Sequence, residues 1–281
     1  MNDTTHNLEK QASCHRACPA GIDVPRYIDS IRQGDFDSAL AIIRERIPFP
    51  AVCGHACFHP CEAVCARQQI DEVIAIRALK RAAVDHGCDG PVPMPAAATG
   101  KRVAIVGSGP CGLTAGYYLA QKGHTVEVFE SMPEAGGLLR YGIPEYRLPN
   151  AVVDREIDRI VQCGVKLRTN TRVDSVDALR RDEFDAVLVA TGAWKPVKLG
   201  VVGEEQPMVQ EGISFLARVN SGQATDIGAH VVVVGGGNTA IDAARSSVRL
   251  GARVTIVYRR TREDMPASSE EIREAEEEGV M

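Results

Sequence analysis

The sequence has no long apolar run, and no stretch approaches the roughly 18 consecutive apolar residues that a membrane-spanning helix requires. Residues 1–11 are polar and lack the apolar core of a secretion signal. Positive charge is not in excess either, because the formal net charge is −5. These absences argue against membrane insertion and against nucleic acid as the main partner, and they lead us to expect a cytoplasmic protein. The length of 281 residues allows two or three globular domains.

Cysteine, by contrast, is abundant: the sequence has nine, and six of them lie between residues 14 and 65. In a chain with no secretion signal, such a cluster indicates metal binding before disulfide bonds. Steps of four residues would place these side chains on one face of a single helix, but Gly54 and Pro60 predict bent turns that let several thiolates converge. The candidate metal ligands are Cys14, Cys18, Cys53, Cys57, Cys61 and Cys65.

Three interpretations of this cysteine cluster are open. Cys18-Pro19 is similar to the end of the bacterial ferredoxin run, in which the Cys before Pro ligates a different cluster from its neighbours, and this favours iron–sulfur. Zinc sites favour Cys-x2-Cys, a spacing that the sequence lacks, although His55 and His59 leave zinc as an alternative. The third interpretation is a set of ordinary buried cysteines.

Residues 1–90 are expected to form a small helical domain. Asp23 is placed to cap a helix with a proline in its first turn, Asp35 opens a second helix, and a third is predicted over Ile74–Asp85. Because the apolar surface of such a domain is small, a metal centre would help to stabilise it. The Pro-rich residues 91–100 predict a linker to the next domain.

The strongest pattern in the sequence begins just after this linker. Val103–Val106 predicts a buried strand, Leu113–Lys122 a helix, and Thr125–Phe129 a second strand that ends at Glu130. Glu130 follows the first motif glycine by 23 residues, close to the spacing of the dinucleotide fingerprint. Between the first strand and the helix stands a G-x-G-x-x-G motif made by Gly107, Ser108, Gly109, Pro110, Cys111 and Gly112.

Each part of this motif has a physical role in binding a dinucleotide. Gly107 permits the tight turn, Gly109 lets the backbone approach a pyrophosphate, and Gly112 lets the helix pack closely on the strand. The helix N-terminus attracts the phosphates, and Glu130 can accept hydrogen bonds from the ribose hydroxyls. The motif alone would also suit a purely structural glycine-rich turn. With strand, helix and acid in place, it predicts a dinucleotide site.

Residues 231–260 repeat this design. Val231–Val234 predicts a buried strand, Ile241–Leu250 a helix, and Arg253–Tyr258 the next strand. The motif between them is G-x-G-x-x-A, the accepted variant with alanine in third place. Its candidate binding residues are Gly235, Gly237, Asn238, Thr239 and Ala240.

The second motif differs from the first in the residues that follow its second strand. Arg259 and Arg260 stand where the first repeat has Glu130. Two guanidinium groups would bind a 2′-phosphate that an acid repels, so the second site suits NADPH and the first suits FAD or NAD. The alternative is a solvated basic turn. Between the two motifs we predict a structured loop over 135–149, a helix over Asn150–Cys163, a strand over Val165–Arg168 and a buried strand over Phe184–Ala190.

The residues of these motifs closely resemble those of one protein family. The chain is similar to the small subunit of bacterial glutamate synthase, to the large subunit of electron-bifurcating ferredoxin:NADP oxidoreductase, and to the N-terminal half of dihydropyrimidine dehydrogenase. The resemblance covers residues 14–281. The segments that carry it are 135–144, 147–149, 235–240, 258–261, Met265-Pro266, Cys14 to Pro19 and Cys53 to Cys65.

The resemblance implies a two-dinucleotide-binding α/β flavoprotein preceded by a small all-α iron–sulfur domain. It implies an FAD-binding domain in residues 101–225, of which only the first part is present, and an incomplete NAD(P)H-binding domain in residues 226–281. By resemblance, the FAD residues are Gly107, Ser108, Gly109, Pro110, Gly112, Glu130, Gly137, Leu138 and Arg147. The NADPH (or NADH) residues are Gly235, Gly237, Asn238, Thr239, Ala240, Arg259 and Arg260. Cys14, Cys18, Cys57, Cys61 and Cys65 fall on ligand positions of two [4Fe-4S] clusters.

The chain also departs from the family pattern. The family has a further Cys-x2-Cys before the position of Cys14, and residues 1–13 contain no cysteine. Some relatives use Gln or Glu as a cluster ligand near the position of Lys80. Lysine is a poor ligand, and Cys53 could serve instead. We therefore expect one complete cluster. The family's chain continues well beyond residue 281, so we expect a fragment or a shortened module that needs a partner chain.

Together these features predict an electron-transfer oxidoreductase subunit. NAD(P)H and FAD would exchange a hydride, and a [4Fe-4S] cluster would pass electrons to or from another redox subunit, such as a glutamate synthase large subunit-like, ferredoxin-like or other iron–sulfur protein. No catalytic side chain is named, because the cofactors carry the reaction. One alternative is a flavin disulfide reductase. That class needs a redox-active pair of cysteines near the flavin, whereas Cys111 and Cys163 are isolated in the sequence. The other alternative is a non-catalytic electron-wiring or docking subunit.

Overall fold

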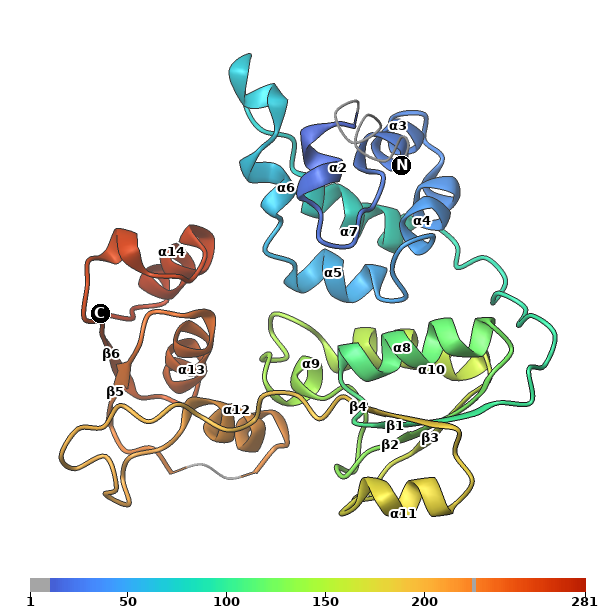
Figure 1. The fold of residues 1–281 in the computed structure, drawn as a ribbon. Helices are drawn as coiled ribbons and strands as arrows, with labels where there is room; N and C mark the ends of the chain where they lie inside the picture. Colours follow the sequence, from blue (N-terminus) through green and yellow to red (C-terminus); the bar gives the residue numbers. More distant parts are fainter. Residues whose placement is uncertain (1–10, 224–225) are drawn as a thin grey trace, which may run out of the picture.

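The structure is a computed structural model that describes residues 11–223 and 226–281. A group of helices, coloured blue to cyan, lies above two α/β regions that stand side by side (Figure 1). The first α/β region is green to yellow and the second is orange to red. The chain passes from the helices to the first α/β region through an extended segment that includes residues 91–100.

The N-terminal region is helical, as predicted. Asp23 accepts a hydrogen bond from the backbone N–H of Arg26 at 3.2 Å, and Asp35 accepts one from Ser38 at 2.9 Å, which confirms both predicted caps. Tyr27 is fully buried in the centre, where its hydroxyl donates to the Ile76 carbonyl at 3.1 Å. The helices are α2 (Ser13–Ala17), α3 (Val24–Arg32), α4 (Phe36–Arg44), α5 (Pro50–Ala56), α6 (Pro60–Ala63), η1 (Ala66–Gln69) and α7 (Ile76–His86).

The first α/β region has a four-stranded parallel sheet in the order β3-β2-β1-β4. Its strands are β1 (Arg102–Val106), β2 (Thr125–Phe129), β3 (Val165–Arg168) and β4 (Ala186–Val189). α8 (Pro110–Gln121) and α10 (Asn150–Gln162) cover one face of the sheet, and α11 (Val176–Arg181) covers the other (Figure 1). α8 begins three residues before its predicted start, because Pro110 occupies its first turn. The short helix α9 (Leu138–Tyr141) lies in the predicted loop.

The second α/β region pairs β5 (His230–Val234) with β6 (Arg253–Val257) in parallel. α12 (Gly212–Asn220), α13 (Asn238–Arg249), η2 (Arg262–Asp264) and α14 (Ser269–Glu277) accompany them. The prediction that Val231–Val234 is buried is wrong, because Val232 and Val234 are each 57% exposed. The same correction applies to β4, where Val189 is also 57% exposed. Alternate side chains of a strand point to opposite faces, and an apolar run does not tell which faces are covered.

A buried carboxylate joins the helical region to the first α/β region. Glu156 of α10 accepts a hydrogen bond from the backbone N–H of Ala51 at 3.1 Å and pairs with Arg44 at 3.3 Å. Burial raises the pKa of Glu156 to about 7, although Arg44 and the backbone N–H groups act in the opposite direction. The folded protein therefore holds this proton to a higher pH than the unfolded chain does.

This carboxyl predicts how stability changes with pH. Between the ordinary glutamate pKa of 4.5 and about 7, the folded state binds more protons at Glu156 than the unfolded state, so its contribution to stability is lost as pH rises. Glu156→Gln keeps an acceptor for the Ala51 N–H and cannot ionise. Urea denaturation at about pH 5 and about pH 8 should show a smaller loss of unfolding free energy in the variant than in the wild type. Equal losses in the two proteins would contradict the assignment.

Candidate cofactor site

The first glycine-rich turn has the close contacts that its motif requires. Gly107 has a φ of +106°, and a Cβ atom there would lie 2.4 Å from the Ala190 carbonyl oxygen. A Cβ atom on Gly112 would lie 2.0 Å from the Gly107 carbonyl oxygen. Gly109 is different, because a Cβ atom there would meet nothing within 4 Å. Gly107 and Gly112 are thus required by the fold, whereas Gly109 faces open space that a ligand can use.

Glu130 supports this turn from inside the protein. One carboxylate oxygen accepts hydrogen bonds from the Ser108 N–H at 2.9 Å and the Ser108 hydroxyl at 2.6 Å. The other accepts from the Met132 N–H at 2.9 Å and the Ser131 hydroxyl at 3.3 Å. A carboxylate has about four acceptor positions, so a ribose hydroxyl would share an oxygen that the protein already uses. The sequence motif gives no sign of this structural role of Glu130 and Ser108.

The segment after β2 returns to the same turn. Gly137 has a φ of +54°, and a Cβ atom there would lie 2.8 Å from the Gly109 Cα atom, so two predicted site residues lie against each other. Leu138 opens α9 directly afterwards. The loop predicted over 135–149 therefore forms one wall of the site, with the glycine-rich turn beside it.

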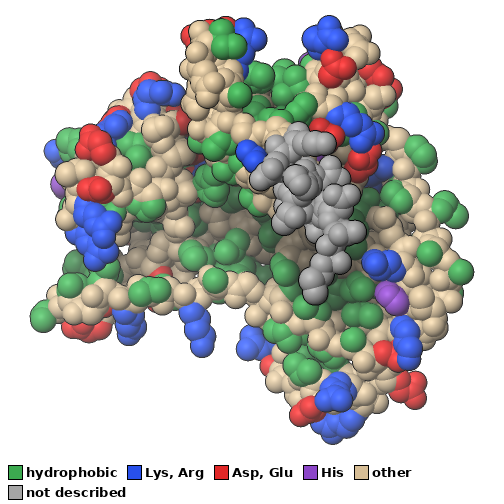
Figure 2. All heavy atoms as spheres, turned by 45° about the horizontal axis from the view of Figure 1, so that its top comes forward, with side chains coloured by type: hydrophobic (Ala, Val, Ile, Leu, Met, Phe, Trp, Pro, Cys, Tyr) green, Lys and Arg blue, Asp and Glu red, His purple; other side chains and the backbone are tan. Residues whose placement is uncertain are grey.

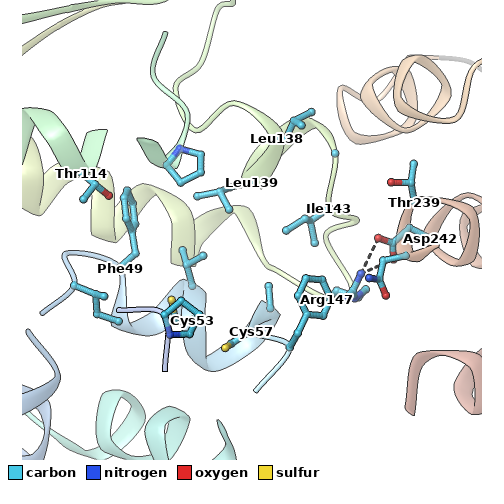
Figure 3. A pocket seen from close by; sticks show the side chains of 18 of the residues that line it. Phe49, Cys53, Cys57, Thr114, Leu138, Leu139, Ile143, Arg147, Thr239 and Asp242 are labelled. Carbon is cyan, nitrogen blue, oxygen red and sulfur yellow. Dashed lines mark hydrogen bonds and ion pairs between the residues drawn. The ribbon is translucent and has the colours of Figure 1, made fainter. Parts of the chain in front are cut away.

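All three regions meet at one cavity of about 660 Å³. Figure 3 shows α5 below it, α9 and the adjoining loop above it, and α13 at its side. In the space-filling view, hydrophobic side chains gather around the hollow in the middle of the molecule (Figure 2). The first α/β region contributes Pro110, Thr114, Leu138, Leu139, Ile143 and Arg147, the second contributes Asn238, Thr239 and Asp242, and the helical region contributes Phe49, Val52, Cys53 and Cys57.

This cavity fits an aromatic ring system that carries a few polar groups. Its wall is mostly apolar, and it begins at Pro110 in the glycine-rich turn. The side-chain oxygen of Asn238 is buried and has no hydrogen-bond partner among the described residues. A buried acceptor without a partner costs free energy, and a ligand N–H would supply what it lacks. A flavin ring meets both conditions.

Arg147 lies in this wall, but its charge is already used. One guanidinium nitrogen lies 2.7 Å from each carboxylate oxygen of Asp242 (Figure 3). Another guanidinium nitrogen lies 2.7 Å from Glu271. The three side chains are only 11%, 6% and 10% exposed. Burial raises the pKa of Asp242 to about 6, with Arg147 acting in the opposite direction. The residue assigned to FAD by resemblance thus joins the two α/β regions.

The ion-pair network continues from Glu271 into neighbouring helices. Glu271 also binds Arg245 of α13 at 3.0 Å, and the guanidinium of Arg245 lies 4.9 Å from the centre of the Tyr146 ring. At the start of α14, Glu270 binds Arg77 of α7 at 2.8 Å. Because α14 contacts both Arg147 and α7 through these pairs, one helix connects all three regions.

The second glycine-rich turn places its residues in two locations. Gly237 caps α13, and Asn238 and Thr239 then face the cavity. Gly235 has a φ of +146°, and a Cβ atom there would lie 3.3 Å from Ala240, which explains the small third residue of the motif. Arg259 and Arg260 follow β6 and are both exposed. No ion pair within residues 11–223 and 226–281 includes either arginine, so both are accessible to an anion.

Four of the six clustered cysteines influence one another. Burial raises the pKa of the Cys61 thiol to about 11; Lys80 acts in the opposite direction, and Cys57 and Cys18 act in the same direction. The same neighbours act on Cys53, whose thiol pKa burial also raises to about 11. Lys80 is nearly fully buried. Cys18, Cys53 and Cys61 also pack in one hydrophobic cluster, and Cys57 and Lys80 are neighbours of both Cys53 and Cys61.

Cys14 packs against the same hydrophobic cluster as Cys18, Cys53 and Cys61, and it also has Cys65 as a neighbour. Burial raises the pKa of the Cys14 thiol, and among its cysteine neighbours Cys65 acts on it in the same direction. In the part of the chain that the structure describes, no three His, Cys, Asp or Glu side chains converge closely enough to hold a metal ion. Metal binding would have to displace protons from these thiols.

The path of the chain between the cysteines corrects one detail of the sequence analysis. Gly54 makes no bend: it lies inside α5, where a Cβ atom would lie 3.1 Å from the Arg81 Cα atom of α7. The predicted break occurs instead between α5 and α6, where His59 has a φ of +42° and Pro60 opens the next helix. The backbone N–H of His59 donates to the Cys57 sulfur at 3.3 Å.

Two protein-family models match this chain. Residues 101–281 match the family model of pyridine nucleotide-disulphide oxidoreductases. The chain belongs to this family. Residues 8–90 match a second model, described as dihydropyrimidine dehydrogenase domain II with a 4Fe-4S cluster. Both regions of the predicted fold class are thereby confirmed.

Curated relatives of this oxidoreductase confirm the resemblance noted from its motifs. It is 42% identical over 96% of its length to the beta subunit of NADP(+)-dependent formate dehydrogenase from Moorella thermoacetica. It is 43% identical over 96% of its length to the beta subunit of NADPH-Fe(3+) oxidoreductase from Geobacter sulfurreducens. In both cases it spans 42% of the relative's length. The glutamate synthase [NADPH] small chain of Mycobacterium tuberculosis is 36% identical, with 85% of this chain and 53% of the relative aligned.

Solved structures agree on the fold. A 2-naphthoyl-CoA reductase complex matches 94% of this oxidoreductase and 38% of that chain, with a TM-score of 0.59 and 22% identity. Such a likeness concerns the fold alone. Within the described residues, no helix is long and apolar enough to cross a membrane.

The network around Arg147 gives a test of how the two α/β regions are held. Arg147→Met leaves the buried carboxylate of Asp242 without its ion pair and leaves Glu271 with Arg245 alone, so we expect the free energy of unfolding to fall by about 3–5 kcal/mol. The control is Arg262→Met, which removes an exposed pair with Glu276 and should cause no measurable loss. Urea denaturation measures both variants. Equal stability of the two would mean that the buried pair does not hold the regions together.

Proposed function

We propose that this oxidoreductase transfers electrons between NADPH, FAD and a [4Fe-4S] cluster, as one subunit of a larger redox complex. The observation that carries the proposal is the shared cavity. Pro110 and Leu138 enter it from the first α/β region, Asn238 from the second, and Cys53 and Cys57 from the helical region. One site thus borders on candidate residues for all three redox groups, which is the arrangement that such a transfer needs.

Each region is assigned one redox group in this proposal. Residues 1–90 hold the cluster, 91–100 form the linker, 101–225 hold FAD, and 226–281 hold the nicotinamide nucleotide. The two family models support this assignment, since one names a pyridine nucleotide and the other a 4Fe-4S cluster. The FAD residues are Gly107, Ser108, Gly109, Pro110, Gly112, Gly137 and Leu138, with Glu130 beneath the turn and Arg147 in the wall. The nucleotide residues are Gly235, Gly237, Asn238, Thr239, Ala240, Arg259 and Arg260.

The cluster ligands are proposed from the cysteines that are neighbours. Cys18 and Cys57 are neighbours of both Cys53 and Cys61, and these four supply the thiolates of one [4Fe-4S] cluster. Cys14 and Cys65 are candidate ligands to a second metal centre that needs further ligands. Zinc remains the weaker proposal, because the sequence lacks the Cys-x2-Cys spacing that zinc sites favour.

The protein's own residues bind and orient rather than react. The bound cofactors supply hydride and single-electron chemistry. Pro110, Leu138, Leu139 and Ile143 exclude water from one side of the cavity, and Asn238 offers a hydrogen-bond acceptor at its edge. Gly109 leaves space for the pyrophosphate beside the start of α8, where backbone N–H groups favour an anion.

The partners are proposed from the relatives' names, which describe beta or small subunits of larger enzymes. We propose other redox subunits as partners, with no nucleic acid and no membrane insertion. All nine cysteines are free, which suits a reducing compartment such as the cytoplasm. The disulfide reductase alternative is disfavoured, because Cys163 is buried in the apolar core, out of reach of a thiol substrate. A docking subunit without cofactors would show no flavin absorbance, iron or sulfide in the test that follows.

The open space at Gly109 allows a sharp test of the flavin assignment. Gly109 has a φ of −69°, so Gly109→Val fits the backbone and blocks the approach of a pyrophosphate. We expect purified wild type to show flavin absorbance and about four iron and four sulfide per chain. Gly109→Val should keep the iron and sulfide and lose the flavin, whereas Cys111→Ala on the same turn should keep all three. Flavin retained in Gly109→Val, or zinc without sulfide in the wild type, would refute the corresponding assignment.

Arg259 and Arg260 allow a test of the nucleotide assignment. A guanidinium pairs with a 2′-phosphate in two charge-assisted hydrogen bonds, each worth roughly 1.5–3 kcal/mol, whereas NADH has only a hydroxyl there. Replacing both arginines by alanine should therefore lower the NADPH-to-NADH ratio of kcat/KM by at least about tenfold. The measurement is a hydride-transfer titration with each nucleotide on the full-length protein. An unchanged ratio would leave the two arginines as a solvated turn.

A further inference from the structure

A second cavity, of about 620 Å³, lies away from the proposed cofactor site. It is enclosed by α4, by the C-terminal half of α8, by α10 and by the start of the linker after α7. The residues that matter in its wall are Arg44, Tyr117, Tyr118, Gln121 and Arg159. None of these residues has a role in the proposed electron transfer, so the cavity needs a separate explanation.

Hydrogen-bond donors without partners are concentrated in this cavity. In the described part of the chain, five buried side-chain nitrogen or oxygen atoms have no hydrogen-bond partner. Three of the five are Arg44 Nε, Gln121 Nε2 and Arg159 Nε, and all three residues line this one cavity. Each is an N–H donor, and a buried donor left without an acceptor destabilises the folded protein. A ligand rich in acceptor oxygens would satisfy these donors.

The two arginines are held in place by their other nitrogens. Arg44 is 10% exposed, and its Nη2 binds Asp89 at 2.5 Å and Glu156 at 3.3 Å. The Nη2 of Arg159 donates to the Pro91 carbonyl at 3.0 Å. These contacts fix the guanidinium planes and leave the two buried Nε–H groups without an acceptor. The site is therefore preorganised for an acceptor, which lowers the entropic cost of binding.

The acidic residues of the wall already have hydrogen-bond or ion-pair partners in the protein. Asp37 accepts a hydrogen bond from the Cys88 N–H at 2.7 Å, and Glu45 pairs with Arg26 at 2.9 Å. Burial raises the pKa of Tyr117, while a weak side-chain hydrogen bond from Gln121 and the charges of Arg159 and Arg44 act in the opposite direction, which places these groups around one hydroxyl. An amide nitrogen carries two N–H groups, so this contact uses only one of the two that Gln121 offers. The rings of Tyr117 and Tyr118 pack edge to face at 5.2 Å and add an apolar surface beside the donors.

We infer that this cavity binds a small oxyanion, a carboxylate or a phosphate, through Arg44, Gln121 and Arg159. The ligand would bridge α4 of the helical region, α8 and α10 of the first α/β region, and the linker. Binding would therefore stabilise the junction between the proposed cluster domain and the proposed FAD domain. The inference does not depend on the proposed function, because it uses none of the proposed cofactor residues.

The experiment measures the thermal stability of the full-length protein, as purified, at constant ionic strength. Sodium phosphate and sodium oxalate are titrated against sodium chloride, and the comparison of the two shows which oxyanion the site takes. We expect a saturable rise in Tm with at least one of them, as mass action requires for a ligand that binds only the folded state. No saturable rise with either anion would overturn the inference and leave a water-filled cavity.

Variants separate this site from the glycine-rich turns, which also attract phosphate. Gln121→Glu places a carboxylate among the donors and should abolish the rise in Tm. Arg159→Gln should lower the affinity for the anion at least about tenfold. Arg155→Gln, on the exposed side of the same helix, should leave the affinity unchanged. Gly109→Val should also leave it unchanged. If Gly109→Val loses the effect while Gln121→Glu keeps it, the anion binds at the nucleotide turn and the inference is wrong.

Discussion

The contact between Arg147 and the carboxylates of Asp242 and Glu271 fixes the geometry on which the rest of the site depends. Asp242 lies on α13 four residues after Asn238, so the two side chains share one face of that helix. By binding Asp242, Arg147 therefore also sets the position of Asn238 and Thr239 in the cavity wall. Buried ion pairs add little net stability, because desolvation offsets the attraction, but they strongly penalise any arrangement that separates the partners. This property suits a contact between two folding units better than one within a core.

A second buried carboxylate, that of Glu130, also fixes the position of one part of the site. Glu130 ends β2 and binds Ser108, which holds the glycine-rich turn against the sheet. The acid that sequence reasoning assigns to a ribose is thus also a structural part of the turn. A substitution at Glu130 would change the turn and the ligand contact together. Gly109 is a cleaner position for testing ligand binding, because its missing side chain faces open space.

The elements of both α/β regions were predictable because their signals are local. The strand β2 has the predicted bounds, and β3 has them too, because short apolar runs are ended by Gly or charged residues nearby. The partner of Arg147 was not predictable, since Asp242 lies 95 residues further along the chain. The cavity also escaped prediction, because its wall combines residues from three regions. The burial of β4 and β5 failed for a related reason, since it depends on what packs against each face.

The path of the chain through the cysteines differs from what their spacing suggests. Equal steps of four residues suggest a helix with one sulfur-lined face, yet the chain breaks after Cys57 and turns through the left-handed backbone of His59. Cys53 therefore lies inside one helix, Cys57 at the C-terminal end of that helix and Cys61 at the start of the next. A single helical face would point every thiol in the same direction, whereas two helix ends can surround a volume. Because Cys53 and Cys57 also line the larger cavity, that volume shares a wall with the space proposed for the flavin.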